Sequence, residues 1–241
     1  MDVYGASLAY KDLSWWENDG TGTQWTRHIV CGSLYNPGWA QARDIDDDGD
    51  LDILAVSDEY SYVAWWENPN GSGEGWTAHI IATWYQFPGS VDSTDFDQDG
   101  DMDVVGTSYV HGLVTLWENM DGMGTTWEES QIASISSVRG ATACDIDLDG
   151  DIDVSVHSYL QDELIWLENM DGTGNQWGHH SCADYTAPEV LTICDINDDG
   201  TPDLLSRPLY FLCLACSQIQ APCLVRKNYY HYPPFEGRLT S

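Results

Sequence analysis

Short runs of alternating apolar and polar residues, separated by clusters of Gly, Asp and Asn, recur along most of the chain. Such runs predict β-strands joined by turns, and no stretch has the spacing of an amphipathic helix. The pattern returns about every 50 residues, which is typical of a repeat architecture. The repeat units are Met1–Asp50, Leu51–Asp101, Met102–Asp151 and Ile152–Thr201.

Every unit has the same internal order. One strand leaves an aspartate-rich loop, and a second strand ends in a motif close to W-W-E-N. A Gly/Asp/Asn turn then leads to a third strand, and a longer loop leads to a fourth strand that enters the next aspartate-rich loop. The motifs lie at Trp15–Asn18, Trp65–Asn68, Leu116–Asn119 and Trp166–Asn169, and the third strands begin at Trp25, Trp76, Trp127 and Trp177.

Four antiparallel strands in each repeat predict an all-β fold, a β-propeller of four-stranded blades. A single blade cannot cover both of its faces, whereas neighbouring blades can bury them against each other. Trp and Leu side chains suit the wedge between two blades. The chain has room for four to five such blades in residues 1–203.

The aspartate-rich loops carry the strongest chemical signal. Asp44–Asp52 reads D-I-D-D-D-G-D-L-D, and D-x-D-x-D-G-x-x-D returns at Asp95–Asp103 and Asp145–Asp153. A fourth copy, Asp195–Asp203, has Asn and Thr at its third and seventh places. Oxygens at places 1, 3 and 5, a glycine at 6, a carbonyl at 7 and a carboxylate at 9 can surround Ca²⁺. Without a cation these carboxylates repel one another.

Two other interpretations of the loops fit less well. A solvated acidic turn explains one copy but not four copies at fixed spacing. An EF-hand needs a glutamate at place 12 and flanking helices, whereas place 12 here is Ala55, Gly106, Val156 or Ser206, and strand-like sequence follows. We therefore expect each loop to join two strands.

The D-x-D-x-D-G-x-x-D loops, together with the W-W-E-N motifs and the periodic tryptophans, resemble FG-GAP/VCBS repeats. These are calcium-binding propeller blades that also occur in integrin α-subunits, and the resemblance covers most of residues 1–203. It implies four strands per blade, named A to D from the inside out, with calcium in the A–B loop.

The resemblance also implies the ligands of about four structural Ca²⁺ ions. The ligand at the seventh place is the backbone carbonyl, and Asn197 with Pro202 should make the fourth site the weakest. The implied residues are Asp44, Asp46, Asp48, Asp50 and Asp52; Asp95, Asp97, Asp99, Asp101 and Asp103; Asp145, Asp147, Asp149, Asp151 and Asp153; and Asp195, Asn197, Asp199, Thr201 and Asp203.

The formal net charge is −32, and the four loops hold 6, 5, 5 and 4 of the 40 acidic residues. Bound Ca²⁺ would neutralise part of this charge, but the chain would still repel nucleic acid and anionic membranes. No apolar run is long enough for a membrane helix.

Calcium loops suit the millimolar Ca²⁺ outside cells, so we expect an extracellular or cell-surface protein. Seven cysteines are compatible with an oxidising compartment, and their odd number leaves at least one unpaired or bonded to another chain. Cys144 and Cys194 hold equivalent places, but neighbouring inner strands lie far apart for a disulfide. Asn70-Gly71-Ser72 is a glycosylation sequon in a predicted turn.

The sequence leaves the completeness of the ring open. Met1-Asp2-Val3 aligns with the end of an aspartate-rich loop, so we expect upstream sequence. Family propellers usually have seven blades, and a fragment, a five-bladed ring and a protomer completed by a neighbouring chain all fit. A divergent segment, 204–241, is basic where the rest is acidic, and we expect it to close the ring or dock on a neighbour.

Catalysis is not predicted. Glu17, Glu67, Glu118 and Glu168 hold equivalent places, whereas a catalytic pair should break the repeat symmetry. No nucleophile elbow, metalloprotease motif or phosphate loop is present. Cys213-x-x-Cys216 with Cys223 and His231 resembles a zinc site only loosely, and its cysteines suit disulfides better.

Most tryptophans lie at repeated positions and are predicted to be core. Trp39, Trp84, Tyr35 and Tyr85 do not repeat and fall in the longer loops, on the face opposite the calcium loops. They either stack on a sugar or a partner protein, or fill the space between blades.

The sequence therefore predicts a non-catalytic, calcium-stabilised module for adhesion, binding or self-assembly. Its partners would be a protein or glycan on the loop-rich face, or further copies joined through edge strands and the C-terminal segment. The alternative is an accessory propeller of a secreted carbohydrate-active enzyme, or a lectin.

Overall fold

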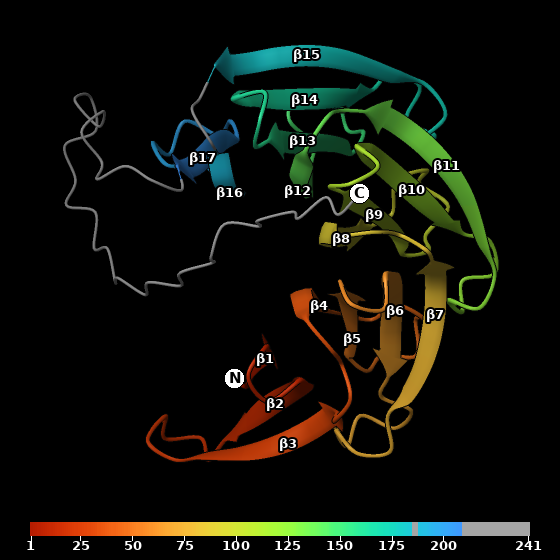
Figure 1. Ribbon diagram of the computed structural model, residues 1–241, viewed down its shortest axis with the longest axis vertical. Coiled ribbons are helices and arrows are strands. Elements are labelled where there is room, and N and C mark those ends of the chain that lie inside the picture. The colour runs from red at the N-terminus through yellow and green to blue at the C-terminus, as the bar shows by residue number, and fades with distance from the viewer. Residues whose placement is uncertain (185–187, 209–241) are drawn as a thin grey trace, which may run out of the picture. The chain divides into compact units, whose positions relative to one another are not determined.

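The computed structural model describes residues 1–184 and 188–208, which form 17 β-strands in five sheets and contain no helix (Figure 1). None of these described residues form a helix long and apolar enough to cross a membrane. The all-β class predicted from the alternating pattern is confirmed.

The strands follow one another in each sheet in chain order, and all neighbours are antiparallel. The first sheet holds β1 (Val3–Ser7), β2 (Asp12–Asn18) and β3 (Trp25–Cys31). The second holds β4 (Pro37–Arg43), β5 (Asp52–Ser57), β6 (Tyr62–Glu67) and β7 (Thr77–Thr83). The third holds β8 (Pro88–Thr94), β9 (Asp103–Ser108), β10 (Leu113–Asn119) and β11 (Trp127–Ser134). The fourth holds β12 (Val138–Cys144), β13 (Asp153–Ser158), β14 (Glu163–Asn169) and β15 (Trp177–Asp184), and the fifth holds β16 (Pro188–Cys194) and β17 (Asp203–Pro208).

Each four-stranded sheet is one propeller blade, with strands A to D in chain order. A blade combines the last strand of one sequence repeat with the first three of the next, so repeat and blade boundaries are offset by one strand. The predicted strand near Val190–Cys194 is present as β16. The predicted boundary at 203 falls at the start of β17, so residues 204–208 belong to a strand; residues 209–241 lie outside the described part of the chain.

Burial changes from the inside of a blade to its outside. All six residues of β5, β9 and β13 are buried, because these second strands have a neighbouring strand on each side and a neighbouring sheet on each face. The fourth strands, such as β7 and β11, have exposed residues along most of their length. The core therefore lies between blades.

The contact between the second and third blades is typical. Trp65 and Val56 of the second blade pack in one cluster with Val91 and Trp117 of the third, and both tryptophans are almost completely buried. A similar cluster joins the third blade to the fourth. The predicted role of the periodic tryptophans as wedges between blades agrees with these positions.

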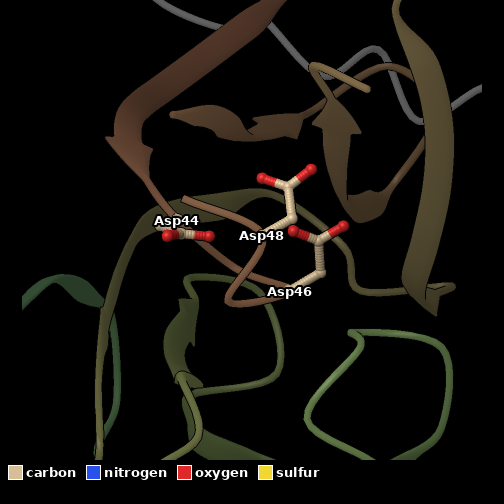
Figure 2. Close-up of side chains that lie close together, drawn as sticks. All are labelled: Asp44, Asp46 and Asp48. Atoms are coloured by element: carbon tan, nitrogen blue, oxygen red, sulfur yellow. The ribbon is translucent and has the colours of Figure 1, made fainter. Parts of the chain in front are cut away.

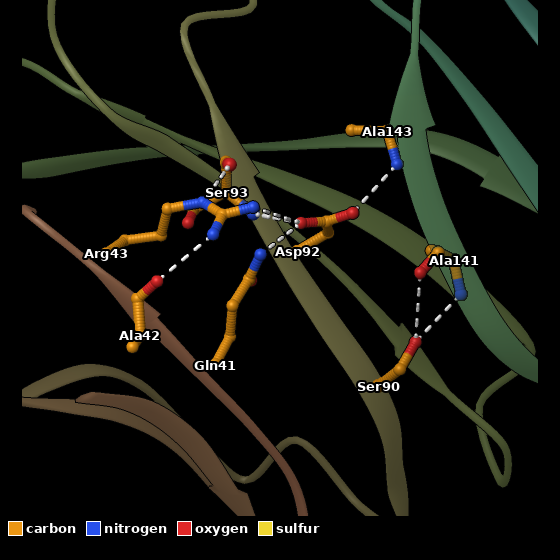
Figure 3. Close-up of polar contacts among 8 residues, drawn as sticks. All are labelled: Gln41, Ala42, Arg43, Ser90, Asp92, Ser93, Ala141 and Ala143. Carbon is orange, nitrogen blue, oxygen red and sulfur yellow. Dashed lines mark hydrogen bonds and ion pairs between the residues drawn. The ribbon is translucent and has the colours of Figure 1, made fainter. Parts of the chain in front are cut away.

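Polar contacts also tie the inner strands of three blades together (Figure 3). Asp92 on β8 accepts a hydrogen bond from Gln41 Nε2 on β4 at 2.6 Å and another from the Ala143 amide on β12 at 3.0 Å. Ser90 Oγ, also on β8, accepts a hydrogen bond from the Ala141 amide at 2.7 Å. Because these groups are largely buried, each bond fixes one inner strand against the next.

The four cysteines among the described residues, Cys31, Cys144, Cys182 and Cys194, form no disulfide. The remaining three cysteines, and the loose zinc pattern that they form with His231, lie outside the described residues.

Close approach of β8 and β12 gives a testable prediction. A Cβ at Gly89 would overlap the backbone carbonyl of Arg139, which cannot move away as a flexible side chain would. We expect Gly89→Ala to lower the free energy of unfolding by about 1–3 kcal/mol or more, measured by urea unfolding. Gly32→Ala is the control, because its nearest neighbour would be 3.9 Å away. Equal stability of the two variants would contradict the close packing of the inner strands.

Candidate metal centre

Four loops connect strand A to strand B in successive blades, as predicted: residues 44–52, 95–103, 145–153 and 195–203. Each loop turns sharply at two places. The glycine at place 6 has φ between 86° and 103°, and the residue at place 4 lies in the left-handed region with φ between 56° and 66°. The sequence predicted the turn at the glycine. It did not predict the second turn at place 4, because the residue there differs from loop to loop: Asp47, Gln98, Leu148 and Asp198.

Backbone amides hold the carboxylates of each loop. In the second loop Asp95 Oδ2 accepts a hydrogen bond from the Gly100 amide at 3.0 Å, and Asp99 Oδ1 accepts one from the Asp101 amide at 2.9 Å. The first, third and fourth loops have the same two bonds. These bonds turn the side chains at places 1 and 5 toward the inside of the loop.

The aspartate at place 9 joins the loop to the third strand of its blade. Asp103 Oδ2 accepts a hydrogen bond from the Phe96 amide at 2.9 Å, and its Oδ1 accepts one from the Asn119 amide at 2.8 Å. Asp52 and Asp153 make the equivalent pairs of bonds. This residue therefore has a structural role in addition to the ligand role that the resemblance implies.

Several carboxylate oxygens have no hydrogen-bond partner, although they are buried. Three of them are Oδ1 atoms of the aspartate at the first place of a loop, in Asp44, Asp95 and Asp145. A fourth is Oδ1 of Asp46, which holds the third place of the first loop. A buried oxygen without a donor is costly, and a cation would satisfy it.

These oxygens converge. Oxygens from Asp44, Asp46 and Asp48 all lie within 4.8 Å of one another, and Figure 2 shows the three carboxylates around the turn of the loop. The same spacing groups Asp95, Asp97 and Asp99 in the second loop, and Asp145, Asp147 and Asp153 in the third. In three of the four predicted ligand sets, the fold thus brings together three of the five residues.

Burial and mutual repulsion raise several pKa values in the loops. Burial, with the charges of Asp97 and Asp99 adding to it, raises the pKa of Asp103 to about 7 despite its two amide donors. Burial likewise raises the pKa of Asp52 to about 6. The pKa values of Asp46, Asp97 and Asp147 are raised by burial and by neighbouring carboxylates.

The donor set fits a hard divalent cation. It consists only of oxygen atoms, carries several negative charges in each loop and leaves buried oxygens unpartnered, which is what Ca²⁺ requires. Residues at places 1, 3, 5 and 9 would hold the ion through carboxylates, and the carbonyl at place 7 would complete the loop's contribution. Such an ion would supply positive charge and fix the hairpin, and no chemistry beyond that is implied.

The fourth loop differs. Asn197 replaces an aspartate, and the Thr201 hydroxyl donates a hydrogen bond to Asp199 Oδ1, which lowers the pKa of Asp199. With less charge to bind a cation, this loop stays the predicted weakest site.

The asparagine of the W-E-N motif has a role that sequence reasoning missed. Asn119 is fully buried; its Oδ1 accepts a hydrogen bond from the Gly124 amide at 3.1 Å, and its Nδ2 donates one to the Ile45 carbonyl at 3.4 Å. Ile45 belongs to residues 44–52 of the preceding blade. This loop and the three equivalent A–B loops are the candidate metal sites, and each is called a metal loop below. Asn169 makes the equivalent contact with Phe96. The invariance of this asparagine among the four repeats was the available signal.

The predicted ligand-binding aromatic residues divide into two groups. Tyr85 is core, because it is only 5% exposed, its hydroxyl donates to the Gly106 carbonyl and its ring packs on Trp117. Of the two alternatives that the sequence left open for Tyr85, its position agrees with filling the space inside the fold and not with stacking on a ligand. Tyr35 is half-buried beneath Lys11, whereas Trp84 in the loop before β8 is 81% exposed and Trp39 on β4 is 46% exposed.

Asn70, the predicted glycosylation site, lies exposed in the β6–β7 turn. Its modification stays a prediction.

The sequence matches the FG-GAP-like repeat family three times, over residues 44–106, 95–156 and 145–206. The chain belongs to the FG-GAP-like repeat family. Each match begins at the first aspartate of one metal loop and ends beyond the next loop, so the repeating unit of the family is the loop with the strands around it.

Solved structures share the propeller fold of this FG-GAP-like chain. One is a lectin from Agrocybe aegerita that recognises non-reducing terminal N-acetylglucosamine, with a TM-score of 0.54, 18% identity and coverage of 81% of this chain and 51% of the lectin. Another is a protein from Lactobacillus plantarum, with a TM-score of 0.51, 15% identity and coverage of 79% and 55%. The FG-GAP-like chain thus spans about half the length of these proteins. A search of curated protein sequences found no match.

The asparagine bridge leads to a prediction for the FG-GAP-like fold. Asn119→Ala removes two buried hydrogen bonds and leaves the Gly124 amide and the Ile45 carbonyl unpaired. We expect the free energy of unfolding to fall by about 1–3 kcal/mol, measured by chemical denaturation. Asn70→Ala, at an exposed turn position, serves as the control. The assigned role is refuted if both variants unfold at the same denaturant concentration.

Proposed function

We propose that this protein is a calcium-stabilised, non-catalytic binding module of the cell exterior. The observation that carries the calcium part is the buried, unpartnered Oδ1 of the first aspartate in three loops, at Asp44, Asp95 and Asp145. A Ca²⁺ ion in each loop would satisfy this oxygen and offset the repulsion that raises the neighbouring pKa values. Millimolar extracellular Ca²⁺ supports the location.

The calcium in this proposal is structural. Each loop joins strands A and B, and its place-9 aspartate reaches the end of strand C, so one ion would fix three strands of a blade. A ligand that binds only the folded state stabilises that state by mass action. The stability of the protein should therefore follow the concentration of free Ca²⁺.

The opposite end of the blades supports a binding role. The loops that precede β4, β8 and β12 share one backbone arrangement, because Leu34, Tyr85 and Ile135 donate amide hydrogen bonds to equivalent carbonyls. Only the middle loop has large exposed aromatic side chains. Trp84 and Phe87 stand where the other two loops have Ser33 with Asn36, and Ser134 with Ser137.

A cavity of about 460 Å³ lies beside Phe87, lined also by Leu8, Lys11, Asn36, Asp58, Glu59 and Ser61. Asn36 Nδ2 donates a hydrogen bond to Asp58 at 2.6 Å, so these two side chains are fixed in place. An exposed aromatic ring beside hydroxyl, amide, ammonium and carboxylate groups suits a sugar ring, which has both apolar faces and hydroxyl groups. The second part of the proposal is therefore that the ligand is a glycan. The lectin with a similar fold supports this part.

Removal of calcium tests the first part. We expect the melting temperature to fall in EDTA and to recover on addition of CaCl₂, since a site at 100 times its dissociation constant contributes about 2.7 kcal/mol. Differential scanning calorimetry measures the shift. NaCl at equal ionic strength is the control for charge screening. If NaCl restores the melting temperature as well as CaCl₂ does, or if EDTA has no effect, the loops do not hold structural calcium.

Glycan binding tests the second part. We expect the calcium-loaded protein to bind glycans ending in N-acetylglucosamine on an array, and Phe87→Ala and Trp84→Ala to weaken binding at least tenfold through loss of stacking. Leu160→Ala is the matched control, because Leu160 is an exposed apolar residue in the turn after β13. A parent protein that binds no glycan, or an equal loss in the control, would remove the glycan proposal while leaving the calcium proposal intact.

A further inference from the structure

Three tyrosine rings contact one another at the end of the second blade that lies opposite the metal loops. The rings of Tyr35 and Tyr60 meet edge to face with their centroids 5.4 Å apart, and the ring of Tyr60 lies parallel to that of Tyr62 with the centroids 5.8 Å apart. Tyr60 is 50% exposed, whereas Tyr35 and Tyr62 are half-buried. Tyr35, Tyr60 and Tyr62 are called the tyrosine platform below.

The platform is continuous with the cavity of about 460 Å³ described above. Lys11 lines this cavity, and its ammonium group lies 4.3 Å from the centre of the Tyr35 ring. Glu59 and Ser61 also line the cavity, and they are the two residues that flank Tyr60 in the chain. A ligand that is longer than the cavity can therefore continue onto the exposed ring of Tyr60.

The backbone beneath the platform is the same in the next two blades. Ser57 Oγ donates a hydrogen bond to the Tyr35 carbonyl at 2.7 Å, and the equivalent serines, Ser108 and Ser158, make the equivalent bond at 2.7 Å. The amide three residues further along donates back to the serine in all three blades. The three platform positions are occupied by Gln86, His111 and Leu113 in the third blade, and by Ser136, Gln161 and Glu163 in the fourth.

The fold therefore does not require tyrosine at any of these positions. The same backbone forms with amide, imidazole, aliphatic, hydroxyl and carboxylate side chains, so the architecture does not explain why three aromatic rings gather in one blade. Aromatic rings left partly exposed in contact with one another are typical of a surface that binds a ligand.

The cavity indicates the class of this ligand. Asn36, Asp58 and Glu59 offer oxygen acceptors there, and Lys11 offers an ammonium donor. Sugar hydroxyls can donate to the oxygens and accept from the ammonium group, while the apolar faces of sugar rings suit aromatic side chains. Aromatic surfaces also bind proline-rich peptides, but proline has no N–H group to donate to these oxygens. A chain of sugars therefore fits the cavity and the platform together.

We propose that the cavity and the tyrosine platform form one extended site for an oligosaccharide, with one sugar unit in the cavity beside Phe87 and the next units over Tyr60 and Tyr62. This inference rests on the glycan ligand proposed above and extends it from a single terminal sugar to a chain of two or more units. The cavity then determines which sugar is bound, and the platform determines how long a chain is preferred. Each ring that contacts a sugar unit contributes roughly two- to tenfold in affinity.

The dependence of affinity on chain length tests the proposal. Isothermal titration calorimetry in CaCl₂ would compare N-acetylglucosamine with its β-1,4-linked oligomers of two to four units. We expect the dissociation constant to be about tenfold lower for the three-unit oligomer than for the single sugar. Tyr60→Ala should bring this ratio close to one, because it removes the exposed ring of the platform. Tyr60→Phe should preserve the ratio, because it keeps the ring and loses only the hydroxyl.

His111→Ala is the matched control, because His111 is the exposed residue at the equivalent place of the third blade. If the parent binds the single sugar and the oligomers equally well, or if Tyr60→Ala keeps the same ratio as His111→Ala, the platform is overturned and the glycan proposal stands. If the parent binds neither the single sugar nor any oligomer, the glycan proposal fails and this inference fails with it. A proline-rich peptide that binds the parent but not Tyr60→Ala, without any effect of glycan length, would assign the platform to peptides instead.

Discussion

Repulsion among carboxylates packed into tight A–B loops is the constraint around which each blade is built. Oxygens of three carboxylates converge in each of three loops, and backbone amides help to orient them: those of Gly100 and Asp101 hold two side chains of the second loop. The place-9 aspartate then connects the loop to the end of strand C through hydrogen bonds from backbone amides of both segments. Consequently the state of a loop and the position of three strands are linked, and neutralising the loop stabilises the blade rather than the turn alone.

The blades are also coupled to one another at their metal-loop ends. Asn119 reaches from the third blade to the Ile45 carbonyl in the second blade's loop, and Trp65 Nε1 of the second blade donates to the Gly124 carbonyl in the third blade's hairpin at 3.1 Å. Gln98 of the second loop donates to Asp151 of the third loop at 2.7 Å. A change in one loop can therefore affect the next loop, and under the proposal of calcium binding the sites would be coupled and not independent.

The sequence was sufficient to predict the strands, the blades and the clustering of carboxylates in three of the four aspartate-rich loops, because each depends on local pattern repeated at fixed spacing. Side-chain contacts between blades were not predictable, since nothing local says that Asp92 bridges Gln41 and Ala143. The same limit left two alternatives open at Tyr85, because its loop position could not show that its hydroxyl donates to the Gly106 carbonyl inside the core.

The loops before β4, β8 and β12 share one backbone conformation, although their side chains differ. They lie at the end of the blades opposite the metal loops. Under the proposed binding role, recognition and folding would use opposite ends of the same strands. A lineage can exchange Ser33 for a bulky ring, or Trp84 for a small hydroxyl, without disturbing the groups that hold the architecture together. Duplication of a blade followed by drift in these few loop positions would then generate new specificities from a frame that stays unchanged.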